Sequence, residues 1–98
     1  MATLYISEYS GLGSGGGYAQ LAQAPAVAEQ TLAIAGASAA SAAFNASTKF
    51  VRLHTDAICS IAFGAAPVAT AAKMRMAANA TEYFGVVAGQ KVAVISNV

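Results

Sequence analysis

Residues 48–98 read TKFVRLHTDAICSIAFGAAPVATAAKMRMAANATEYFGVVAGQKVAVISNV, and much of this stretch alternates between apolar and polar or small side chains. Alternation with a period of two is typical of half-buried strands, and Gly and Pro residues separate the runs. We therefore predict strands at TKFVRL (48–53), AICSIAFG (57–64), KMRMA (73–77), TEYFGVV (81–87) and KVAVIS (91–96). The stretch Ala88–Gln90 is expected to close a hairpin between the last two strands.

These runs indicate an all-β fold. Val51 and Leu53 are expected to face one way, and Phe50, Arg52 and His54 the other. Short strands spaced about 8–12 residues apart are typical of sandwiches and barrels. We predict a small antiparallel β-sandwich or jelly-roll-like barrel, folded as one domain over residues 1–98. Its N-terminal half, residues 1–47, is rich in Gly and Ala and supplies strands and loops, while residues 48–98 supply the main antiparallel strands.

The chain begins with another strand signal and a glycine-rich segment. LYISEY (4–9) alternates, and SGLGSGGG (10–17) is expected to form a flexible loop or a wide turn because glycine carries a high backbone entropy. Gly11, Gly13 and Gly16 match the spacing G-x-G-x-x-G, which in nucleotide-binding folds opens a helix after a strand. Pro25 interrupts any such helix, so the spacing does not indicate a nucleotide site.

Residues 18–47 carry weaker signals. AVAEQTLAIA (26–35) alternates and is predicted to be a strand that ends at Gly36. The small residues of 36–47 indicate a helical turn or a loop anchored by Phe44, with a short helix over Ala37–Phe44 as the alternative.

Composition limits the function classes. Charged residues make up 9% of the chain and the net charge is +1. A monomer with so few charged residues is poorly protected against association, so we expect a homo-oligomer or a component of a larger assembly. Nucleic-acid binding requires a basic surplus on one face, so no nucleic-acid partner is expected. The N-terminus lacks the pattern of a secretory signal, and the uncharged run Gln30–Thr48 is too poor in strongly apolar residues for a membrane helix, so no membrane partner is expected.

We expect no catalytic residue, cofactor or metal site. His54, Asp56 and Cys59 nominally supply the residue types of a cysteine hydrolase. However, Cys59 lies in an apolar run that we predict to be buried, where a thiol reacts slowly. A metal site needs several ligands of the His, Cys or carboxylate type, and His54 is the one histidine of the chain.

Tyrosines and one charge pair are the candidate interface residues. Tyr5, Tyr9 and Tyr18 are proposed to contact a partner, since Tyr is enriched at interfaces. Together with Tyr83 they form the alternative, a stacking platform for a small ligand or carbohydrate. Arg75 and Glu82 are expected to meet across the turn between KMRMA and TEYFG, either as a surface pair or as an intersubunit contact.

About half of the chain resembles small structural proteins of tailed bacteriophages and prophages. The resembling pattern is an Arg-containing strand, an acidic turn, Ala-Phe-Gly, a Pro/Ala/Thr link, a small-residue turn, Glu-Tyr-Phe, a Gly turn and a final Lys-Val-Ala-Val-Ile strand. These positions are Arg52, Asp56, Ala62–Gly64, Pro67–Thr70, Asn79–Ala80, Glu82–Phe84, Gly89 and Lys91–Ile95.

The resemblance implies a β-sandwich, often trimeric, that is made in the bacterial cytoplasm and resides on the virion. It implies a non-enzymatic capsid decoration or cement protein that bridges subunits of the major capsid protein. A neck, tail or fibre-attachment protein is the alternative within the same class, and a carbohydrate- or ligand-binding sandwich is the alternative outside it.

Overall fold

The computed structural model describes residues 2–14, 20–22 and 24–98. Within these residues the chain forms strands and no helix. The strands are β1 (Thr3–Tyr9), β2 (Leu12–Ser14), β3 (Gln20–Ala22), β4 (Ala28–Ala33), β5 (Ala39–Ala40), β6 (Phe50–Thr55), β7 (Cys59–Gly64), β8 (Met74–Met76), β9 (Thr81–Gly85) and β10 (Lys91–Ser96).

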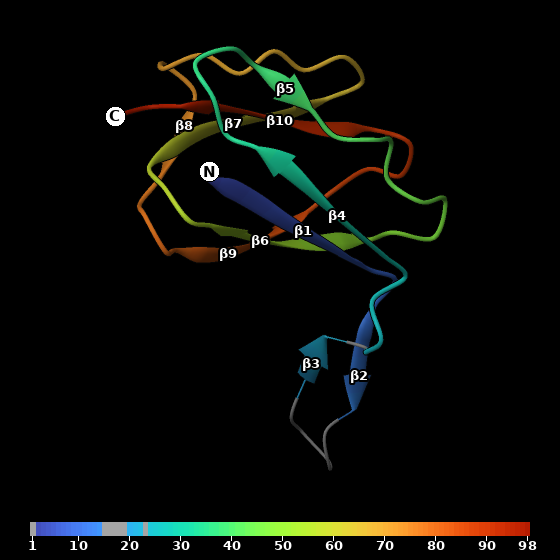
Figure 1. The fold of residues 1–98 in the computed structure, drawn as a ribbon. Helices are drawn as coiled ribbons and strands as arrows, with labels where there is room; N and C mark the ends of the chain where they lie inside the picture. Colours follow the sequence, from blue (N-terminus) through green and yellow to red (C-terminus); the bar gives the residue numbers. More distant parts are fainter. Residues whose placement is uncertain (1, 15–19, 23) are drawn as a thin grey trace.

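Two four-stranded sheets form the body of the molecule (Figure 1). One has the strand order β4-β1-β6-β9 and the other β5-β10-β7-β8, and the neighbouring strands in both are antiparallel. Figure 1 shows the sheets as two layers, and the predicted all-β sandwich is confirmed.

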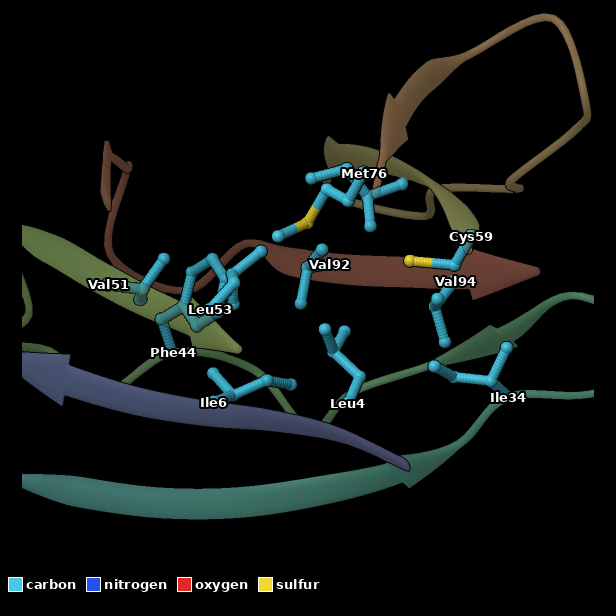
Figure 2. Packing of buried hydrophobic residues seen from close by; sticks show 11 residues of the cluster. Leu4, Ile6, Ile34, Phe44, Val51, Leu53, Cys59, Met76, Val92 and Val94 are labelled. Atoms are coloured by element: carbon cyan, nitrogen blue, oxygen red, sulfur yellow. The ribbon is translucent and has the colours of Figure 1, made fainter. Parts of the chain in front are cut away.

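The core lies between the two layers (Figure 2). Leu4 and Ile6 of β1 point from one sheet toward Val92 and Val94 of β10 in the other. The alternation predicted for β6 is also confirmed, because Val51 and Leu53 are fully buried and their neighbours are not. The other buried members of this cluster are Ile34, Phe44, Cys59, Ile61 and Met76.

The second sheet is also covered on its outer side. The residues of β7 that point away from the core are small, as is Ala93 in the middle of β10, and Ser60 and Ala93 are fully buried. The segment 65–73 runs across this side in Figure 1. It is held there by hydrogen bonds from the Ala69 amide to Ser38 Oγ (2.9 Å) and from Asn97 Nδ2 to the Ala71 carbonyl (3.2 Å). Small side chains therefore let the chain cover one of its own sheets.

The glycine-rich segment differs from the prediction. Leu12–Ser14 forms β2 and pairs with Gln20–Ala22, so part of the expected loop is the arm of a small antiparallel hairpin. Backbone pairing in this hairpin offsets the entropy on which the loop prediction rested. Figure 1 shows the hairpin projecting from the sandwich, which contributes to the elongated dimensions of 44 × 26 × 21 Å.

The segment after β4 contains no helix, so the helical alternative for Ala37–Phe44 is wrong. Ala39 and Ala40 pair with β10, and the backbone of Phe44 exchanges hydrogen bonds with the turn before β10. The Phe44 amide donates to the Gln90 carbonyl (2.7 Å), and the Gly89 amide donates to the Phe44 carbonyl (3.1 Å). Phe44 is buried, as predicted for the anchor of this segment.

The predicted hairpin at Ala88–Gln90 is wrong. β9 pairs with β6, whereas β10 pairs with β7 and β5, so this turn carries the chain from one sheet to the other. Gly89 has φ of 83°, in the left-handed region that favours glycine, so the turn itself is real although its strands do not pair. β8 and β9 also belong to different sheets, so no hairpin joins KMRMA to TEYFG.

Candidate functional site

The outer side of the β4-β1-β6-β9 sheet carries a group of aromatic side chains that we call the aromatic face. It comprises Tyr5 and Tyr9 of β1, Phe50, Arg52 and His54 of β6, and Tyr83 of β9. Because side chains alternate along a strand, these residues point away from the core residues that lie between them. Tyr5 is 44% exposed and Tyr83 is 58% exposed, so large apolar surface faces solvent here.

Cross-strand pairing fixes the geometry of the rings. Tyr9 lies opposite Phe50 and stacks on it, with ring centroids 5.2 Å apart and planes 19° apart. Phe50 is tilted against Tyr83 at 6.3 Å, and Tyr5 is tilted against His54 at 6.2 Å. These separations lie within the range of favourable aromatic contacts. The rings therefore support one another and form a preorganised surface.

A shallow depression lies at one end of this face. It is lined by Tyr5, Ser7, Arg52, His54 and Asp56. The His54 ring is held by a hydrogen bond of 2.8 Å between Nδ1 and the hydroxyl of Thr81 on β9. The depression combines ring surface with a cation, a carboxylate and hydroxyl groups, which are the groups that bind a polar partner side chain or a sugar.

The nominal hydrolase residues are not brought together. His54 and Cys59 belong to strands in different sheets, and Cys59 is fully buried and faces the core. Burial raises the pKa of the Cys59 thiol, and the hydrogen bond from its Sγ to Thr55 Oγ1 (3.6 Å) opposes this effect. The predicted burial of Cys59 is confirmed. The described residues also contain no cluster of three or more His, Cys, Asp or Glu side chains placed to hold a metal ion.

The candidate interface residues separate into groups. Tyr5 and Tyr9 lie together on the aromatic face, and Tyr18 lies outside the described residues. Arg75 is in β8 of the other sheet, opposite Ser60, while Glu82 is in β9 opposite Leu53. β8 and β9 belong to different sheets, so no hairpin brings Arg75 and Glu82 together, while an intersubunit contact between them stays a prediction.

Glu8 is the residue that sequence reasoning did not recognise. It lies on the inward side of β1 and is 1% exposed. Its carboxylate accepts hydrogen bonds from Thr48 Oγ1 (2.7 Å), the Asn45 amide (2.8 Å) and Gln30 Nε2 (3.3 Å). A buried carboxylate requires such donors. The sequence signal that could have identified Glu8 is its spacing, because it lies two residues after Ile6 and four after Leu4 and so shares their inward side of the strand.

The Glu8 network positions one end of the aromatic face. It holds the segment that enters β6, and the Lys49 amide adds a hydrogen bond of 2.8 Å to the Tyr9 carbonyl. Phe50 follows directly and is thereby placed against Tyr9. A polar anchor on the inner side of β1 thus supports the ring stack on its outer side.

No family model, curated protein or solved structure matches this chain. The part of the chain that the structure describes contains no helix with the length and apolar character needed to cross a membrane.

Proposed function

We propose that this chain is a non-enzymatic structural protein of a bacteriophage virion, and specifically a capsid decoration protein. The proposal joins the resemblance in residues 52–95 to the aromatic face, which is the observation that carries it. Exposed Tyr together with Arg is typical of protein interfaces, and the contacts among the rings already order part of this face.

The proposed mechanism is adhesive. The aromatic face of each copy contacts the major capsid protein, and the weak contact is repeated over many copies on the lattice. Linked contacts gain affinity through effective concentration without any new chemistry at each site. A chain with 9% charged residues loses little by desolvation of charges in such a contact.

Copy number in purified particles tests the role. Quantitative mass spectrometry against the major capsid protein is expected to give comparable copies of the two chains. A handful of copies, or a few dozen, would instead indicate a neck, tail or fibre-attachment protein. Absence from particles would contradict the virion assignment altogether.

A matched pair of variants tests the face. Tyr5→Ala removes an exposed ring from the aromatic face and is expected to weaken particle binding by about tenfold or more. Arg75→Ala removes an exposed side chain from β8 and is expected to leave binding unchanged. Release of the protein by Arg75→Ala but not by Tyr5→Ala would place the contact on the other sheet.

The depression at Tyr5, Arg52, His54 and Asp56 supports a second candidate, a carbohydrate-binding module. Sugars stack on exposed rings and accept and donate hydrogen bonds at their edges, and this depression offers both kinds of group. A glycan array separates the two functions. Binding to a defined glycan that is lost in Arg52→Ala would favour the module, whereas no bound glycan would favour the decoration role.

A further inference from the structure

Among the described residues, β9 is an open edge of the sandwich. Within the described residues, the other sheet ends in the short strands β5 and β8, and short edges resist pairing with another chain. Near the β4 edge, the Gln30 side chain is bonded to a neighbouring segment, because Gln30 Oε1 accepts a hydrogen bond from the Ala42 backbone amide (2.9 Å). β9 spans Thr81–Gly85 and pairs with β6 on one side, and none of the described residues forms a strand on its other side.

The hydrogen bonds of β9 show which of its backbone groups are free. The Thr55 amide donates to the Ala80 carbonyl (3.1 Å), and the Val86 amide donates to the Lys49 carbonyl (3.0 Å). In an antiparallel ladder the residues that bond to a neighbouring strand alternate with residues whose N–H and C=O groups point away from it. The even-numbered residues of β9 therefore bond to β6, and the outward-pointing residues are Thr81, Tyr83 and Gly85.

We propose that β9 pairs antiparallel with β9 of a second copy of this chain, with the two-fold axis at Tyr83. In this register Tyr83 faces the second copy's Tyr83, and Thr81 faces the second copy's Gly85. All of these are outward-pointing residues, so each exchanges its N–H and C=O with the residue opposite. The strand is thus self-complementary, as a two-fold interface requires.

The side chains agree with this register. The two Tyr83 rings meet on the outer side of the sheet, where aromatic cross-strand pairs are stabilising. Glu82 lies opposite the second copy's Phe84 rather than its Glu82, so no like charges face one another. Gly85 offers no side chain against Thr81, and the space that a Cβ would occupy at Gly85 is open. The two sheets then form one continuous sheet that carries both aromatic faces.

This assembly is a two-fold dimer and replaces the trimer that the resemblance implies. It concerns the isolated protein and does not depend on particle binding, so its failure leaves the proposed function standing. Sedimentation equilibrium of the full chain over a concentration series measures it directly, and the wild type is expected to be a dimer.

Two lysine variants on the same strand test the register. Tyr83→Lys brings like charges together at the two-fold axis and is expected to raise the dimer dissociation constant by about tenfold or more. Thr81→Lys adds the same charge to the same strand but faces Gly85 of the second copy. It is expected to change the dissociation constant by less than about threefold.

A charge-swapped mixture shows whether loss of the dimer reflects pairing or damaged folding. Tyr83→Lys and Tyr83→Glu are each expected to dimerise more weakly than the wild type when alone and to form a heterodimer when mixed. A wild type that stays monomeric, or a trimer that Tyr83→Lys leaves intact, would overturn the proposal. Equal weakening by Thr81→Lys and Tyr83→Lys, or the absence of a heterodimer, would also overturn it.

Discussion

The two outer sides of this sandwich carry different side chains, and among the described residues only one of them is covered by another segment of the chain. At the centre of the β5-β10-β7-β8 sheet the outward residues are small, and segment 65–73 runs across this side, where Ser60 and Ala93 are fully buried. On the β4-β1-β6-β9 sheet the outward residues include several large rings, and Tyr5 and Tyr83 stay about half exposed. The chain covers the surface that small residues make approachable and leaves the aromatic face open.

The burial patterns along the strands show the same difference. Buried and partly exposed residues alternate along β6, as in a sheet with one solvated side, whereas consecutive residues are buried in β7 and β10. The outer sides therefore differ in what a substitution should do. A change on the covered side is expected to act on folding, and a change on the aromatic face is expected to act on the proposed partner contact.

Loss of the Glu8 carboxylate is expected to have the largest effect on stability. Glu8→Ala leaves the buried Thr48 hydroxyl and the Asn45 amide without their acceptor, and should lower the free energy of unfolding by about 3 kcal/mol. Glu29→Ala, on the exposed outer side of β4, is the matched control and should change it by less than about 0.5 kcal/mol. Urea unfolding measures both. Similar losses in the two variants would show that the network does not anchor β1.

The second test compares the outer sides directly. Ala93→Leu places a large side chain under segment 65–73 and should lower the free energy of unfolding by about 1–3 kcal/mol. Thr31→Leu makes a similar addition beside Tyr5 on the open sheet and should change it by less than about 0.5 kcal/mol. If thermal and urea unfolding found Ala93→Leu harmless, segment 65–73 would not pack closely on its sheet.

Periodicity predicted the strands better than it predicted their partners. The alternation around Val51 and Leu53, and the apolar run around Cys59, report burial residue by residue, and the structure confirms both. Which strand lies beside which is a long-range choice that the same alternation satisfies in several ways. The turn at Gly89 looked like a hairpin for this reason, although it connects two sheets.

The candidate site was only partly predictable. Tyr5 and Tyr9 share a strand, so their common side followed from the period of two. Phe50 and Tyr83 join them through sheet pairing, which local sequence does not encode. The alternation of 4–9 allows Glu8 to share the side of Leu4 and Ile6, but Glu8 could not be recognised as an anchor because its donors lie 22 to 40 residues away.

Thiol labelling is the mildest test, because it compares accessibility with little change in stability. Native Cys59 should react slowly with a thiol reagent, since it is fully buried and its raised pKa keeps the thiol protonated. In a Cys59→Ala background, Ser60→Cys probes the covered outer side of β7, and Thr31→Cys probes the open sheet. We expect Ser60→Cys to react about 100-fold more slowly than Thr31→Cys, because it must wait for local opening of segment 65–73. Equal labelling rates would show that the two outer sides are equally accessible to solvent, which would contradict the difference in coverage described above.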